Sequence, residues 1–141
     1  MSFQRDYLLR MIEMLGDLII ALLGKIKKGE FEKANEQLEH IYYDFLKNDA
    51  AFFRSLPEDQ LTENLLQEHN YTHGHLQILA ELFFVEAELR TARNEFTESK
   101  SYFQKSLKIF EFIDVEMKTF DADRLNKINM LREKINEFEN T

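Results

Sequence analysis

Residues 76–113 read LQILAELFFVEAELRTARNEFTESKSYFQKSLKIFEFI, and this stretch decides the fold. Apolar side chains recur at steps of three and four in its first half: Ile78, Leu82, Val85, Leu89, Ala92 and Phe96. The second half repeats that rhythm with Phe103, Leu107 and Phe110 beside Ile109 and Ile113. This spacing places the side chains on one face of an α-helix. We therefore expect two antiparallel helices joined by a tight turn at Arg93-Asn94-Glu95-Phe96.

Small residues stand among large ones in both predicted helices. Ala87, Ser99 and Ser106 alternate with bulky side chains, among them Phe83 and Phe103. Small side chains let two helix axes approach closely, and the aromatic rings fill the space around them. The pattern predicts tight packing of one helix on the other.

The same hairpin resembles a tetratricopeptide repeat, a helix-turn-helix unit of about 34 residues with small and large residues at fixed spacing. The matching positions are Phe83, Ala87, Asn94-Glu95-Phe96, Ser99, Phe103 and 104–107. Glu86 and Arg90 depart from the family, which has apolar or aromatic residues there. A second match is Gly29-Glu30-Phe31-Glu32-Lys33-Ala34, followed by Leu38 and Ile41. Gly29 and Asn94 lie two repeat lengths apart, which leaves room for a degenerate repeat between them.

The opening run, Phe3-Gln4-Arg5-Asp6-Tyr7-Leu8-Leu9-Arg10-Met11-Ile12-Glu13, is similar to a family of small bacterial proteins described as repeat-like, to which no activity is assigned. Together the two resemblances imply one all-α, TPR-like domain over residues 1–141. It would contain about six antiparallel helices arranged as three stacked helix-turn-helix pairs.

Stacked helix pairs leave a concave face that receives a partner's helix or extended peptide. By the resemblance, the groove-facing positions of the hairpin are Glu81, Phe84, Glu88 and Thr91. In the first unit they are Ile19, Ile20, Leu23 and Ile26. Because this second set is strongly apolar, we expect it to be covered, either by the C-terminal helix or by a second chain in a homodimer through the N-terminal helix.

Further helices are predicted at 3–28, 30–47 and about 57–69, where Ser55-Leu56-Pro57-Glu58 matches a capping box. Gly16 and Gly24 each cost the first helix stability, and close approach of another helix would explain them. The C-terminal stretch is interpreted as two helices with a break near 115–121 and Asp121 as the cap. One helix over 96–139 is the alternative.

Composition excludes several classes of protein. The 141 residues contain no Cys, so disulfides, thiolate metal sites and cysteine nucleophiles are absent. The net charge of −8 disfavours a general nucleic-acid binder, which needs basic residues to neutralise phosphates. Residues 3–28 are interrupted by charges and do not provide the ~20 apolar residues of a membrane span. We expect a cytoplasmic protein without a cofactor.

Two groups of polar residues are candidates for a metal site or a ligand contact. His69, His73 and His75 lie close together beside Glu68, and such residues suit zinc. The loop signals Asn70 and Gly74 would spoil their helical spacing, so we interpret the segment as a polar helix connection. A small helical metal-binding protein or enzyme using it is the alternative function.

Glu86 and Arg90 interrupt an apolar face, and we interpret them as an intrahelical ion pair rather than a ligand contact. No other motif requires catalysis. The sequence thus favours a non-enzymatic interaction or scaffold module that binds a protein or peptide, without nucleic acid. A peripheral membrane role through residues 3–28 ranks last.

Overall fold

The protein was analysed as a computed structural model that describes residues 2–140, with side chains from residue 6 onward. Within that range the structure has seven α-helices, one short 3-10 helix and no strand. The helices are α1 (Ser2–Lys27), α2 (Phe31–Leu46), α3 (Ala50–Arg54), η1 (Glu58–Gln60), α4 (Glu63–Glu68), α5 (His73–Ala92), α6 (Phe96–Met117) and α7 (Ala122–Glu139). The predicted all-α class is confirmed.

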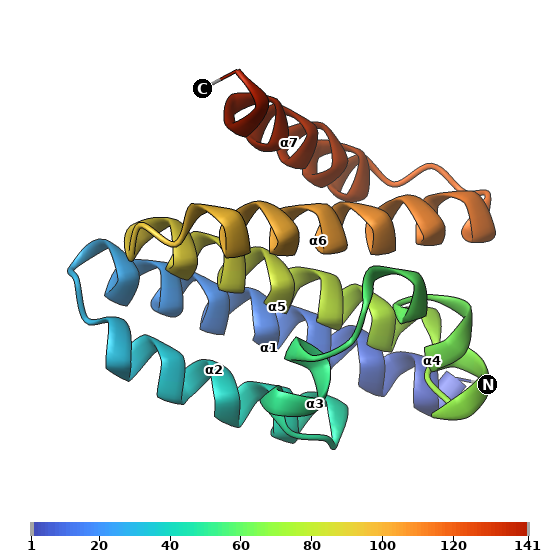
Figure 1. The fold of residues 1–141 in the computed structure, drawn as a ribbon. Helices are drawn as coiled ribbons and strands as arrows, with labels where there is room; N and C mark the ends of the chain where they lie inside the picture. Colours follow the sequence, from blue (N-terminus) through green and yellow to red (C-terminus); the bar gives the residue numbers. More distant parts are fainter. Residues whose placement is uncertain (1, 141) are drawn as a thin grey trace.

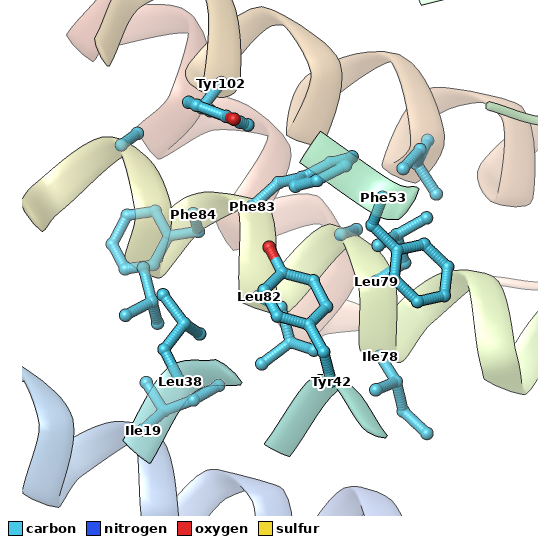
Figure 2. Packing of buried hydrophobic residues seen from close by; sticks show 14 of the residues in the cluster. Ile19, Leu38, Tyr42, Phe53, Ile78, Leu79, Leu82, Phe83, Phe84 and Tyr102 are labelled. Carbon is cyan, nitrogen blue, oxygen red and sulfur yellow. The ribbon is translucent and has the colours of Figure 1, made fainter. Parts of the chain in front are cut away.

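The five long helices lie side by side, and α5 is at the centre (Figure 1). α5 packs against α1, α2 and α6, while α7 packs on the outer side of α6. Each long helix reverses the direction of the one before it where a turn connects the two (Figure 1). One contiguous apolar core runs from α1 to α7. Figure 2 shows its centre, where Leu38 and Tyr42 of α2 face Leu82 of α5 beside Ile19 of α1.

The two predicted turns share one backbone geometry. Gly29 and Asn94 both adopt a left-handed conformation, with φ of 81° and 63°. In each turn the residue that follows donates its amide to the carbonyl oxygen five positions earlier. Glu30 donates to Lys25 at 2.9 Å, and Glu95 donates to Arg90 at 2.8 Å. This is the bond that closes a Schellman motif at a helix C-terminus. The predicted turn positions are thus confirmed, and the same device ends α1 and α5.

The α5–α6 hairpin is closely packed through its small residues. Ser99 and Ser106 are fully buried, and their hydroxyls donate to the carbonyl oxygens of Ala87 and Ala80 at 2.8 and 2.7 Å. A buried hydroxyl without such a partner would destabilise the fold. The serines therefore combine close approach of the two helices with satisfied hydrogen bonds.

The segment between α2 and α5 differs from prediction. No single helix covers 57–69, since only η1 and α4 form there. The predicted capping box is wrong: the Ser55 hydroxyl donates backward to the Phe52 carbonyl at 2.8 Å and closes α3 instead. α3 forms because the Asp49 carboxylate accepts from the Phe52 amide at 2.9 Å, an N-cap that satisfies a free helix donor.

The C-terminal stretch forms two helices, as predicted. α6 ends at Met117, Lys118 follows with a left-handed φ of 54°, and α7 begins at Ala122. The Asp121 carboxylate caps α7 by accepting from the Arg124 amide at 3.0 Å. With α7 single and only short helices between α2 and α5, the finer description as three stacked pairs is not confirmed.

Candidate functional site

A groove runs along one face of α5, between α1 and α7. It consists of two hollows, of about 400 and 720 Å³, that share Met130 of α7. Its floor is a single stripe of α5 at helical spacing: Gln77, Glu81, Phe84, Glu88 and Thr91. At 1.5 Å per residue this stripe is about 21 Å long, the length of a four-turn helix. α1 contributes Ile12, Leu23, Ile26 and Lys27 to one wall, and α7 contributes Asp123, Lys127, Met130 and Lys134 to the other.

The four positions predicted for the hairpin all lie along this floor, where polar side chains alternate with an aromatic ring. Glu81 and Glu88 are ion-paired with Lys127 and Lys134 of α7 at 3.3 and 3.0 Å. The Lys127 ammonium also lies 4.9 Å from the Phe84 ring centroid, within the range of a cation–π contact. Two lysines of α7, seven residues apart, therefore hold this helix against the groove edge of α5.

The two floor carboxylates are buried beside their lysine partners. The Oε1 atoms of Glu81 and Glu88 are the atoms that face Lys127 and Lys134. Burial raises the pKa of the Glu81 carboxyl, and Lys127 opposes that shift. Buried acceptors normally have a donor. Here the two lysine ammonium groups are the partners of these oxygens.

The four apolar residues predicted for the first unit divide into two sets. Ile19 and Ile26 belong to the core, with exposed fractions of 5% and 8%. Leu23 is half-buried in the groove wall, and Ile20 is 72% exposed. α1 packs on α2 and α5, so its own chain covers the first two residues and leaves the others open.

Charge differs between the two ends of the groove. The hollow near the start of α5 contains three carboxylates, Glu81, Asp121 and Asp123, against Arg124 and Lys127. The other hollow contains two lysines, Lys27 and Lys134, against Glu88. The groove therefore has an acidic end beside Ile12 and a basic end beside Leu23.

The histidine segment does not assemble into one site. The His75 ring stacks on Tyr71 at 5.0 Å, and its Nδ1 accepts from the Thr72 amide at 3.0 Å in a capping box. His73 turns instead toward Glu116 of α6, 3.7 Å away. Over the described side chains, no group of three His, Cys, Asp or Glu is placed to hold a metal ion. Nothing in this geometry adds support to the metal-binding alternative.

Glu86 is the centre of a polar network that the sequence did not reveal. Its side chain is fully buried and ion-paired with Arg54 of α3 at 2.5 Å, while Arg90 lies 3.7 Å away. The Tyr42 hydroxyl donates to the same carboxylate at 3.2 Å. Burial, together with the Glu86 charge, raises the pKa of Tyr42 well above its ordinary value.

Arg54 continues this network to Asn35 and Glu39 of α2, with both contacts at 2.8 Å. The predicted Glu86–Arg90 pair exists, but Arg54 of α3 is the nearer partner of Glu86. The network joins α2, α3 and α5 on the side away from the groove lining, so its role is structural.

Comparison of the chain with family models, with curated proteins and with solved structures found no match. Among the helices described, none is both long and apolar enough to cross a membrane.

Proposed function

We propose that the protein is a non-enzymatic interaction module whose groove receives an amphipathic helix or extended peptide of another polypeptide. The observation that carries this proposal is the groove between α1 and α7, about four helical turns long, with an unfilled apolar wall. Helix-in-groove binding uses an apolar stripe on the ligand and a matching apolar groove. Leu23, Met130 and Phe84 provide that apolar surface here.

The arrangement of the long helices supports the same proposal. α1, α5 and α7 contribute most of the groove lining, whereas α2 and α6 contribute only Phe31 and Phe110, and the turns after α1 and α5 share one geometry. In tetratricopeptide-like arrays the first helix of each unit lines the concave face, as these three helices do. α7 would then be the first helix of a third unit that has no second helix.

The floor gives the groove polar selectivity. The ion pairs Glu81–Lys127 and Glu88–Lys134 lie on either side of Phe84, so a ligand helix with polar groups seven residues apart would meet both pairs. Groups that reject unsuitable partners in this way contribute to specificity as well as affinity.

Photo-crosslinking in cells tests the proposal. A benzophenone amino acid is placed at Leu23 on one wall, at Met130 on the other, and at Tyr43 as the control. Tyr43 is 60% exposed on α2 and does not line the groove. We expect both wall positions to trap the same polypeptide through one helical or extended segment, and Tyr43 not to trap it. Equal products at all three positions, or none at the walls, would overturn the proposal.

A further inference from the structure

α1 carries an uncovered apolar stripe on the side that borders the groove. Leu9 and Ile20 are 51% and 72% exposed, and Ile12 and Leu23 are half-buried in the groove wall. With Gly16 between them, these residues fall within an arc of about 80° on a helix of 3.6 residues per turn. The stripe is continuous over four turns, which is the length of the groove floor.

The stripe is symmetric about Gly16. Going outward, the apolar residues lie four and seven positions away on both sides: Ile12 and Leu9 toward the N-terminus, Ile20 and Leu23 toward the C-terminus. When two identical helices pack antiparallel about a two-fold axis, each residue before the centre meets its counterpart after the centre in the other chain. Leu9 would meet Leu23 of the second copy, Ile12 would meet Ile20, and Gly16 would meet Gly16.

Gly16 has no packing role within the chain. A Cβ atom added there would meet nothing within 4 Å, so the expected close approach of another helix is not made by the described part of this chain. Glycine in the middle of a helix lowers its stability. A second helix crossing at this position would give the residue a function, because the missing side chain lets the axes come closest there.

Charge selects the antiparallel orientation. Over residues 6–17 of α1 the exposed charged side chains are three acidic ones, Asp6, Glu13 and Asp17, and one basic one, Arg10, whereas Lys27 and the following Lys28 are exposed at its end. An antiparallel second α1 would bring its basic end to the acidic end of the groove, near Asp121 and Asp123. Its residues 6–17, with more acidic than basic exposed side chains, would then lie over the basic end, near Lys27 and Lys134. A parallel helix would bring its own lysine-bearing end to that basic end, which is unfavourable.

We propose that the helix received by the groove is α1 of a second copy of this chain, antiparallel and crossing at Gly16, so that two copies close into a symmetric dimer. This rests on the proposed function, and it names the partner of the same groove. Because each copy both donates α1 and receives it, the contact closes on itself and does not propagate.

Engineered cysteines test the register, since the chain has no Cys of its own. Gly16→Cys has open space for its side chain and should form an intermolecular disulfide under mild oxidation. Met14→Cys is the matched control, because Met14 is 58% exposed on the same helix but outside the stripe. Leu9→Cys alone and Leu23→Cys alone should each keep free thiols, and the two variants should become crosslinked to each other when mixed.

Sedimentation equilibrium measures the association itself. The unmodified chain should be a dimer, Ile20→Glu should be a folded monomer by circular dichroism, and Met14→Glu should remain a dimer. A monomeric unmodified chain, crosslinking of Gly16→Cys no faster than of Met14→Cys, or self-crosslinking of Leu9→Cys alone would overturn the proposal.

These results separate this proposal from the proposed function. A monomer whose groove walls trap a different polypeptide keeps the interaction module and removes the dimer. Trapping of a second copy from both walls supports the dimer and the module together. A monomer with no trapped partner removes both.

Discussion

α1 and α5 are both long, strongly apolar helices, but the chain covers them very differently. α5 has neighbours on three sides, α1, α2 and α6, and eleven of its residues are buried. α1 has its main contacts with α2 and α5, and Leu9, Met14 and Ile20 remain exposed. The amount of apolar surface on a helix reflects how many neighbours it has in the working protein. For α5 these neighbours are in the chain, whereas the proposed dimer would supply a further neighbour for α1.

The largest effect is expected from truncating the helix that is enclosed. Phe83 of α5 is fully buried, so Phe83→Ala should lower the free energy of unfolding by about 3–5 kcal/mol through lost burial and a cavity. Ile20→Ala on α1 should change it by about 0.5 kcal/mol or less when measured on monomer, because Ile20 is exposed. Urea denaturation of both variants gives the comparison. Equal losses would show that α1 and α5 are covered alike.

The next effect concerns the buried charge on α5. Glu86→Gln should cost about 3 kcal/mol, because Arg54 loses its charged partner inside the protein. Glu88→Gln is the control on the same helix. Glu88 is 24% exposed at the groove, and its pair with Lys134 should contribute about 1 kcal/mol or less. Replacing Glu86 by Leu and Arg54 by Met together should recover most of the loss. Failure of that double variant to recover would show that the network contributes through more than the pair.

A smaller effect should come from the open side of α1. Nothing lies within 4 Å of a Cβ at Gly24, so Gly24→Ala should stabilise the protein by up to about 1 kcal/mol through helix propensity. Gly29→Ala is the contrasting variant, since its φ of 81° favours glycine and the change should destabilise. The two melting temperatures, compared with the unmodified chain, test both signs. A loss at Gly24 would reveal a neighbour there.

The smallest effect is a pH dependence at the start of α5. Burial lowers the pKa of His75 below its ordinary 6.5, so the folded state prefers the neutral ring. The stability linked to that neutral ring is present above pH 6.5 and is lost as pH falls through the lowered folded value. Protonation would also remove the Nδ1 acceptor from the Thr72 amide.

His75→Gln tests this dependence, because Gln keeps the capping box without a titrating group. The variant and the unmodified chain should unfold at similar urea concentrations above pH 6.5, and the unmodified chain should weaken more below it. Parallel pH profiles for the two proteins would assign the acid sensitivity elsewhere.

The parts of the fold that the sequence predicts are those fixed by local chemistry. The apolar periodicity predicted the five long helices. Gly29 and Asn94 predicted the ends of α1 and α5, and Asp121 predicted the start of α7, because turn and cap preferences depend on a few neighbouring residues. Ser55 and Asp49 show the limit. Both side chains can cap a helix. Which helix each one caps depends on whether residues 50–54 are helical, and packing of that segment against α2 decides this.

The groove was only partly predictable for a similar reason. The stripe of Glu81, Phe84 and Glu88 is readable from spacing, yet its pairing with Lys127 and Lys134 joins residues more than forty positions apart. On α1, neighbouring positions such as Ile19 and Ile20 have the same hydropathy, and only the direction of approach of α5 separates the buried one from the exposed one. Glu86 looked like part of a local pair because Arg54 has no sequence signal that ties it to α5.

The outer helices at the two ends of the row expose polar side chains. α2 exposes Glu32, Lys33, Glu36 and Asp44, and α7 exposes Asn129, Arg132, Glu133 and Asn136. Helical arrays need terminal helices with such a polar outer face to stay soluble. An engineer who wished to lengthen this molecule would therefore insert new hairpins between α6 and α7, keeping the last helix as the terminator.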